Sequence, residues 1–205
     1  MRTRTSIARP PTAPEPPATP APPARCDARQ RRTIIAAAHA LGVPRNYARR
    51  RGLRQVREPA RLDPVGLDIH GRMQWLVPEA ARALAAMRKH AAEAGIVLKV
   101  VSAYRSADYQ LEILRRKLVV GQSIERILEV SAAPGYSEHH SGRAVDLTTS
   151  GTHPLEEEFE RSLAYAWLRR NARRFGFRLS YPRGNVHELA FEPWHWCWHR
   201  DNQRT

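Results

Sequence analysis

The sequence is poor in cysteine and has no long apolar run. Two cysteines in 205 residues, Cys26 and Cys197, exclude a disulfide-stapled fold and a cysteine-based structural zinc site, and we expect both thiols to be free. No window approaches 18 uninterrupted apolar residues, which predicts the absence of a transmembrane helix. The first eleven residues lack the apolar stretch of an ordinary signal peptide. Eleven glycines are too few for a collagen-like chain.

Acidic residues are scarce in the first part of the chain. The net charge is +14, and residues 1–60 carry 13 arginines, no lysine and only three acidic residues, so most of the excess lies there. Such a segment either contacts an anionic surface, namely a membrane, nucleic acid or a wall polymer, or is a solvated basic extension. The rest of the chain lacks a basic face interleaved with stacking aromatics, so we expect no specific nucleic-acid binding.

Composition divides the chain into three parts. Residues 1–26 form a tail rich in proline and alanine, which cannot build a packed core and is expected to be disordered. Residues 27–61 are basic, with a helix up to about Gly42 and an arginine-rich connector after it. The hydrophobic content of 42% is sufficient for one compact domain, which we place at residues 62–200.

The compact domain is predicted to be α+β, because helices and strands alternate without a regular βαβ rhythm. We expect a small, mainly antiparallel central sheet that carries the functional site and is flanked by helices. Helices are predicted over residues 79–94, 106–117, 123–130 and 156–175, the last with Phe159 and Leu163 facing inward. Strands are predicted over residues 96–102, 143–147, 177–180 and 188–191.

Histidine and aspartate lie close together in a first cluster, Ser137-Glu-His-His-Ser-Gly-Arg-Ala-Val-Asp146. Asp146 lies in a short apolar strand, where a carboxylate is costly unless it is paired or bound to a cation. His139 lies seven residues before it, and imidazole with carboxylate is a usual ligand set for zinc. Taken alone, the spacing favours a loop histidine and a salt-bridged aspartate.

A second cluster, Glu192-Pro-Trp-His195, lies near the end of the chain. Positions three apart face opposite sides of a regular strand, and Pro193 removes a ladder donor, so the chain must bend if Glu192 and His195 are to converge. A carboxylate beside an activated water can take its proton and pass it to a leaving amine. Taken alone, this cluster favours an aromatic core plug with satisfied polar partners.

Together the clusters supply two histidines, one aspartate and a spare glutamate. That composition is typical of a catalytic zinc site with an open position, and less so of a closed structural site. The sequence has no H-E-x-x-H, P-loop, G-x-G-x-x-G or G-x-S-x-G motif. A third element is Arg105, in Ser102-Ala-Tyr-Arg-Ser106, where a strand enters a helix. Its guanidinium could bind a substrate carboxylate, although a surface arginine at a helix entry is the commoner case.

Four motifs in this order resemble a known family. The motifs are Ser-x-Tyr-Arg-Ser at 102–106, Gln110, Pro-Gly-x-Ser-Glu-His-x-x-Gly-x-Ala-x-Asp-Leu at 134–147, and Glu-Pro-Trp-His at 192–195. Together they resemble the VanY-type D-alanyl-D-alanine carboxypeptidases, which belong with lysostaphin-like enzymes and the hedgehog domain in one zinc peptidase superfamily. The resemblance spans about residues 62–199.

The resemblance implies roles for the matching residues. One zinc ion would be bound by His139, Asp146 and His195. Glu192 would be the catalytic base, and Arg105 would stabilise the scissile carbonyl or hold the terminal carboxylate. The implied reaction is hydrolysis of the terminal peptide bond of a peptidoglycan stem peptide, with release of D-alanine and no acyl-enzyme.

Other positions follow the family less closely. Ser137 and Gln110 would help to hold the peptide. His140 replaces a residue that is often glutamine in relatives, and it competes with His139 as a ligand candidate. Residues 184–191 depart from the family pattern and are expected to shape the substrate pocket.

The function classes that remain open differ in what happens at the site. The first is a D,D-carboxypeptidase, or an L,D-carboxypeptidase that acts one residue further in. The second is an endopeptidase that cuts stem peptides or crossbridges, and the third is a wall-binding module without turnover. Retention of Glu192 favours turnover. The implied substrate places the protein in the cell envelope or periplasm, although no signal peptide is visible. A different start, an atypical export route and recycled muropeptides in the cytoplasm each account for this, and free cysteines fit the last slightly better.

Overall fold

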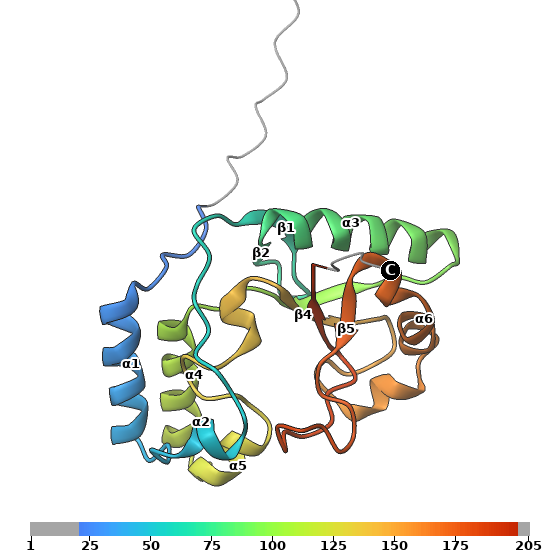
Figure 1. Cartoon of the computed structure of the whole chain (residues 1–205). Helices are drawn as coiled ribbons and strands as arrows, with labels where there is room; N and C mark the ends of the chain where they lie inside the picture. The colour runs from blue at the N-terminus through green and yellow to red at the C-terminus, as the bar shows by residue number, and fades with distance from the viewer. Residues whose placement is uncertain (1–20, 201–205) are drawn as a thin grey trace, which may run out of the picture.

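The computed structural model describes residues 21–200, and Figure 1 shows the arrangement of its elements. The α-helices are α1 (Ala28–Ala40), α2 (Tyr47–Arg50), α3 (Pro78–Glu93), α4 (Ala107–Val119), α5 (Ile124–Glu129) and α6 (Leu163–Asn171). Short 3-10 helices are η1 (Glu138–Ser141), η2 (Glu157–Arg161) and η3 (Ala172–Phe175). The strands are β1 (Asp63–Leu67), β2 (Met73–Leu76), β3 (Lys99–Ser102), β4 (Ala144–Thr148), β5 (Phe177–Leu179) and β6 (His195–Trp198). The tail was predicted to be disordered, and its residues 1–20 lie outside the described residues.

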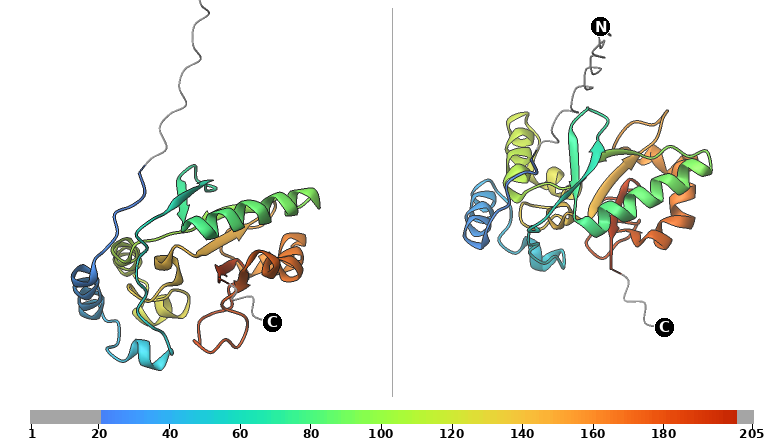
Figure 2. Two further views of the ribbon diagram at one scale, coloured as in Figure 1. Left: turned by 45° about the horizontal axis from the view of Figure 1, so that its top comes forward. Right: turned by 90° about the horizontal axis from the view of Figure 1, so that it is seen from above.

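An antiparallel sheet of order β3-β4-β6-β5 lies at the centre of the fold. In Figure 1, α1, α4 and α5 lie to the left of the sheet, and α3 and α6 lie above it and to its right. A separate hairpin pairs β1 with β2 and packs beside α3, as both views in Figure 2 show. The predicted α+β class, with a small antiparallel sheet flanked by helices, is therefore confirmed.

The main core lies between the sheet, α3 and α6. Its fully buried side chains come from all three parts, and include Leu84, Met87, Val145, Leu147 and Leu168. Helix α3 begins with Pro78 at its first position, where a missing N–H costs nothing, and Gly95 follows its end with a φ of 73°. Every residue of β4 is buried, so the side chains on both of its faces are held tightly.

A second core joins the N-terminal segment to α4 and α5. Ile34 and Ala38 of α1 pack with Leu111 and Leu114 of α4 and with Ile127 of α5. Asp27 begins α1 with a capping box, as its side chain accepts a hydrogen bond from the backbone N–H of Gln30. Side chains from before residue 62 thus share a core with the later helices, while the division of the chain into domains stays a prediction.

Two predicted elements differ from the structure. The helix predicted over residues 156–175 is broken at Ser162, whose hydroxyl caps α6 by accepting from the backbone N–H of Tyr165. This break changes the helix phase, and Leu163 is exposed instead of buried. The strand predicted over residues 188–191 is wrong, because the Asn185 side chain bonds Leu189 and folds this stretch into an irregular loop. Among the described residues, no helix has both the length and the apolar composition needed to cross a membrane.

Candidate metal centre

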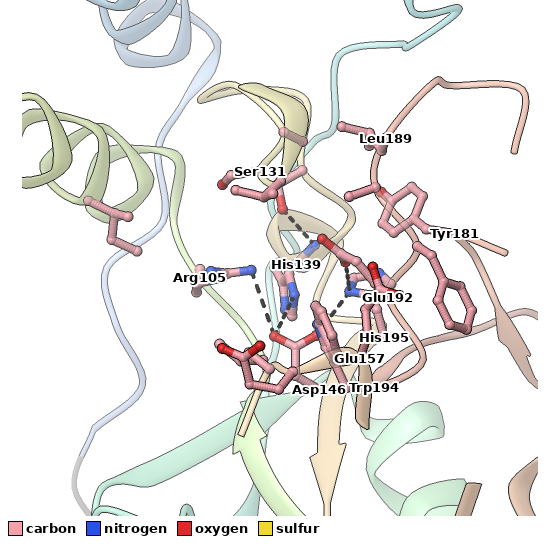
Figure 3. Close-up of a pocket in the computed structure, with 18 of the residues that line it drawn as sticks. Arg105, Ser131, His139, Asp146, Glu157, Tyr181, Leu189, Glu192, Trp194 and His195 are labelled. Carbon is pink, nitrogen blue, oxygen red and sulfur yellow. Dashed lines mark hydrogen bonds and ion pairs between the residues drawn. The ribbon is translucent and has the colours of Figure 1, made fainter. Parts of the chain in front are cut away.

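Asp146 and His195 are brought together by strand pairing. They are direct cross-strand partners on β4 and β6, and Ser102 of β3 lies opposite Asp146 on its other side. His139 reaches the same point from η1, and its ring lies 4.9 Å from the His195 ring, centroid to centroid. The three side chains are 2–3% exposed, and their candidate ligand atoms all lie within 4.8 Å of one another. Figure 3 shows this cluster with Arg105 on one side and Glu192 on the other.

The short helix η1 fixes the place of His139. Ser137 begins it, with its hydroxyl accepting a hydrogen bond from the His139 N–H. Gly142 ends it with a φ of 65°, which favours glycine. A Cβ atom at Gly142 would lie 2.9 Å from Leu62 Cδ2, so the close packing there also needs glycine. Glycine at position 142 is therefore a requirement of the turn that leads from η1 into β4.

The protonation of His139 indicates a cation. Its Nδ1 donates to the carbonyl of Ala103 at 2.6 Å, and burial lowers the pKa of His139 to about 4, so Nε2 carries a lone pair at neutral pH. That Nε2 atom is buried, has no hydrogen-bond partner and lies 3.2 Å from Asp146 Oδ2. Two acceptors face each other without a shared proton, which is unfavourable unless a positive ion lies between them.

His195 is held by carboxylates at both ring nitrogens. Nδ1 lies 3.0 Å from Asp146 Oδ1, and Nε2 lies 2.9 Å from Glu138 Oε2. Burial lowers the pKa of His195, but the hydrogen bonds to both carboxylates outweigh it and raise the pKa to about 10. Glu138 also accepts from Ser180 Oγ at 2.6 Å, and the hydrogen bond to His195 overcomes burial and lowers the pKa of Glu138 to about 2.

Glu138 therefore belongs to the site, although the sequence assigned it no role. It lies within a recognised motif, but only the position of Ser180 and His195 in the fold reveals its contact. Tyr181 was missed in the same way. Its ring packs over His195, with the centroids 4.8 Å apart, and no sequence signal marks it. These residues orient a candidate ligand from behind, as is usual around metal-binding histidines.

The donor set fits zinc. Two imidazoles and one carboxylate, with room left for a further ligand, are the composition of catalytic zinc sites. Asp146 is buried, which would raise its pKa, but the neighbouring imidazoles of His139 and His195 hold that pKa well below its usual range. Asp146 is thus a carboxylate at neutral pH, and a divalent cation among these residues would remove the repulsion between Asp146 and His139.

Glu192 lies beside the cluster and outside the candidate ligand group. Its Oε2 is 3.7 Å from His195 Nδ1, and the backbone N–H of His195 donates to the Glu192 carbonyl across a turn at Pro193 and Trp194. The predicted bend between Glu192 and His195 is confirmed by this turn. Burial raises the pKa of Glu192 to about 7, against a smaller opposing effect of His195.

Arg105 faces the cluster from the opposite side. Its Nη2 lies 3.9 Å from Asp146 Oδ2, and its Nε is buried without a hydrogen-bond partner. The backbone of Arg105 is held by η1, because its N–H donates to the His139 carbonyl and its own carbonyl accepts from His140 Nδ1 at 2.7 Å. The backbone of Arg105 is thus fixed, and the Nε–H of its guanidinium is free to donate. This arrangement suits recognition of an anionic or carbonyl oxygen.

His140 does not join the candidate ligands. Its Nδ1 donates to Arg105, and its Nε2 accepts from the backbone N–H of Gly135 at 3.1 Å, so both ring nitrogens are occupied. Burial lowers the pKa of His140 to about 4, which agrees with this neutral, two-sided arrangement. His140 connects two loops and lies outside the metal group.

The two predicted peptide-holding residues differ in their placement. Ser137 lines the cavity described below. Gln110 is buried and is not among the residues that line the cavity; its amide donates to Ser131 Oγ and to the Ala132 carbonyl. Since Ser131 and Ala132 do line the cavity, Gln110 supports its wall from behind.

The cluster lies in a cavity of about 560 Å³. Ile113 and Lys117 of α4 line it, as do Leu189 and Phe191. Figure 3 shows Arg105 and Leu189 on different sides of the cluster. Lys117 is half-buried, and burial and the charge of Arg105 lower its pKa. No ion pair of Lys117 is found among residues 21–200. The cavity thus joins the candidate metal centre and Glu192 to a cationic wall formed by Arg105 and Lys117.

Comparison with known proteins places this geometry in context. The family profile described as "VanY: D-alanyl-D-alanine carboxypeptidase" matches residues 73–201. The D-alanyl-D-alanine carboxypeptidase of Enterococcus faecalis (strain ATCC 700802 / V583) is 34% identical over 112 residues, covering 50% of this chain and 40% of that protein. The chain spans less than half the length of the curated relatives it matches.

Solved structures show the same similarity. The LdcB LD-carboxypeptidase, solved to explain peptidoglycan recognition, is 32% identical, with a TM-score of 0.62 and 69% of each chain covered. A vancomycin resistance D,D-pentapeptidase VanY variant in complex with Zn(II) is 28% identical, with a TM-score of 0.53, covering 69% of this chain and 82% of that one.

Proposed function

This chain belongs to the VanY D-alanyl-D-alanine carboxypeptidase family, and we propose that it is a zinc-dependent carboxypeptidase of peptidoglycan stem peptides that releases D-alanine. The observation that carries this proposal is the arrangement of Glu192. Its carboxylate lies 3.7 Å from His195 in the cavity that also holds His139 and Asp146, yet it is outside the candidate ligand group. A spare base beside a three-residue metal site supports hydrolysis over mere metal storage.

The residues of the cavity divide the chemical work. A bound zinc ion would supply Lewis-acid activation of the scissile carbonyl and of water. Glu192 accepts a proton from the attacking water while the water oxygen forms a bond to the carbonyl carbon. It then gives the proton to the amine of the leaving D-alanine as the C–N bond breaks. Arg105 donates to the carbonyl oxygen, on which negative charge develops.

The cationic wall supports a carboxypeptidase over an endopeptidase. Arg105 and Lys117 line the same side of the cavity; Arg105 has Asp146 Oδ2 at 3.9 Å from its Nη2, whereas no ion pair of Lys117 is found among residues 21–200. A substrate that ends in a free carboxylate supplies the missing negative charge, whereas an internal peptide bond does not. An endopeptidase that acts on crossbridges is therefore the second candidate.

Mass spectrometry of purified muropeptides tests the proposal. The zinc-loaded protein is incubated with tetrapeptide and pentapeptide substrates, in parallel with chelator-treated protein and the Glu192→Gln variant. We expect loss of one D-alanine from one of the two substrates, abolished by chelator and reduced about 10²–10⁴-fold in Glu192→Gln. The substrate consumed distinguishes D,D from L,D specificity. No release from either substrate by protein with zinc bound contradicts the proposal, and cleavage of crosslinked material would favour an endopeptidase.

The cellular location of the protein and the role of its basic segment are tested separately. We place the substrate in the cell envelope, with recycled muropeptides in the cytoplasm as the alternative, and fractionation distinguishes the two. We also propose that the basic segment before residue 61 contacts an anionic surface. Replacement of the exposed Arg29, Arg32 and Arg45 by glutamine should then weaken sedimentation with purified sacculi and leave hydrolysis of soluble muropeptides unchanged.

A further inference from the structure

The loop over residues 181–191 forms one wall of the cavity. Tyr181, Leu189 and Phe191 line it, together with Ala190, and the loop ends at the proposed base Glu192. The backbone N–H of Glu192 donates to the Tyr181 carbonyl at 3.1 Å, so the two ends of the loop are joined. The position of the loop tip therefore sets the width of the cavity, while the bond between the two loop ends holds the backbone of Glu192.

The tip of the loop is attached to Arg51, the residue that follows α2. The Arg51 guanidinium donates to the carbonyls of His187, at 3.1 Å, and of Glu188. In return, His187 Nδ1 donates to the Arg51 carbonyl at 2.8 Å. Three hydrogen bonds thus join two segments that are 136 residues apart in the sequence.

The backbone at the attachment point is in a conformation that needs support. Glu188 has a φ of 52°, in the left-handed region that non-glycine residues adopt at a cost of about 1 kcal/mol. Its carbonyl is one of the two that Arg51 binds. A second attachment lies close by, where the Ala190 N–H donates to the Glu129 carbonyl at the end of α5. The contacts from α2 and α5 hold the loop in a shape that its own backbone does not favour.

The segment over residues 51–58, which begins with Arg51, also touches the other walls of the site. Figure 1 shows it crossing the molecule from α2, at the lower edge, to the hairpin at the top. Val56 donates its N–H to the Gly135 carbonyl, in the loop that leads to η1. Glu58 accepts from the Ala107 N–H, directly after the turn that carries Arg105. Residues 51–58 all precede the segment that matches the family profile.

We propose that Arg51 is a positioning residue that fixes the wall formed by residues 189–191 and so determines how tightly the site holds its substrate. This inference rests on the proposed carboxypeptidase function. Arg51 does not line the cavity, so it acts through the loop and has no contact with the reacting groups. Its loss should therefore weaken substrate binding more than it slows the chemical step.

Steady-state kinetics of Arg51→Ala, with the zinc-loaded full chain, tests the inference. We expect a rise in KM of about tenfold with kcat within about twofold of the wild type, and partial recovery in Arg51→Lys. Amide hydrogen exchange over residues 185–191 should become faster in Arg51→Ala. Arg49→Ala is the matched control, because Arg49 is exposed, lies in α2 and has no side-chain contact to the loop among those described. His187→Ala removes the reciprocal bond and the edge contact of its ring with Tyr181, leaves the two bonds from the Arg51 guanidinium, and serves if Arg51→Ala does not fold.

The outcomes separate this inference from the proposed function. An unchanged KM, or a fall in kcat alone, overturns the role of Arg51 even when the wild type is active. If the wild type hydrolyses no stem peptide, the carboxypeptidase proposal fails by itself. The dissociation constant of a pentapeptide, measured by calorimetry, then takes the place of KM. The inference is overturned if the wild type and Arg51→Ala bind the peptide equally and hydrogen exchange over the loop is unchanged.

Discussion

Glu138 Oε2 lies 2.9 Å from His195 Nε2, on the side of the ring opposite Asp146. This contact fixes the orientation of the imidazole, because Nε2–H of His195 donates a hydrogen bond to Glu138. Nδ1 is then the ring nitrogen that faces the cluster. Ser180 in turn holds the carboxylate of Glu138. The candidate metal centre thus depends on a chain of contacts that extends from β6 through η1 to the end of β5.

Removal of the Glu138 carboxylate should weaken zinc binding without removing a ligand. We expect Glu138→Ala to lower zinc affinity about 10–100-fold, because His195 loses its orientation. Glu138→Gln keeps an acceptor oxygen and should lose less. Competition against a chromogenic chelator measures both, with Ser180→Ala as the milder control. Equal affinities in Glu138→Ala and the wild type would show that β6 alone orients His195.

Alanine substitutions of the adjacent histidines His139 and His140 should have different effects, one on zinc binding and the other on stability. His139→Ala removes a candidate ligand, so stoichiometric zinc binding and hydrolysis should both be lost. His140→Ala removes two buried hydrogen bonds and should lower the free energy of unfolding by about 2–4 kcal/mol, while one zinc per chain is retained.

Elemental analysis of purified variants, paired with denaturant unfolding, distinguishes these outcomes. The pair is its own control, since both substitutions delete a buried imidazole from η1. Loss of zinc from His140→Ala with retention in His139→Ala would reverse the assignment.

Much of the candidate site could be predicted because its residues lie in short motifs. His139 and Asp146 are seven residues apart, and the bend between Glu192 and His195 followed from strand periodicity and Pro193. The contacts of Glu138 and Tyr181 could not be predicted in this way. They depend on which strands pair and in which register, and this is decided by tertiary packing.

The fold shows the same division between local and distant signals. The caps Ser106 and Ser123 marked the starts of α4 and α5, because capping is a local interaction. The hairpin of β1 and β2 was missed, since Pro64 and Gly66 lie within β1 and weaken its strand signal. Residues 188–191 were predicted to be a strand, because the contacts from Arg51 and Glu129 that shape this part of the loop come from distant parts of the chain.

Lys117 should report on the free carboxylate of the substrate. If its charge complements that group, Lys117→Met should lower kcat/KM about tenfold for a peptide with a free terminal carboxylate, and little for the corresponding amide. Lys117→Arg keeps the charge and should retain most activity. Lys89→Met, on the exposed side of α3, is the control for loss of a positive charge. An equal loss on the acid and the amide would remove Lys117 from carboxylate recognition.

Glu58 is expected to stabilise the fold through four donors. Its buried carboxylate accepts from the N–H and thiol of Cys26, the hydroxyl of Tyr104 and the N–H of Ala107. Glu58→Gln replaces one acceptor oxygen by an NH₂ group that faces donors, so at least one buried donor loses its partner. Each such loss costs about 1–3 kcal/mol, and we expect a total decrease in the free energy of unfolding of about 2–4 kcal/mol.

A double-mutant cycle with Tyr104→Phe tests whether this cost comes from the hydrogen bonds. The single variant Tyr104→Phe removes one donor and should cost about 1 kcal/mol. In the combined variant, the new NH₂ group at position 58 no longer faces the Tyr104 hydroxyl, so the two costs should be less than additive, as is usual for residues in one network. Glu125→Gln, at an exposed position of α5, should stay within about 0.5 kcal/mol of the wild type. Full additivity would mean that Glu58 acts on Tyr104 and Ala107 separately, and Glu58 would then hold the turn that carries Arg105 through the Ala107 bond alone.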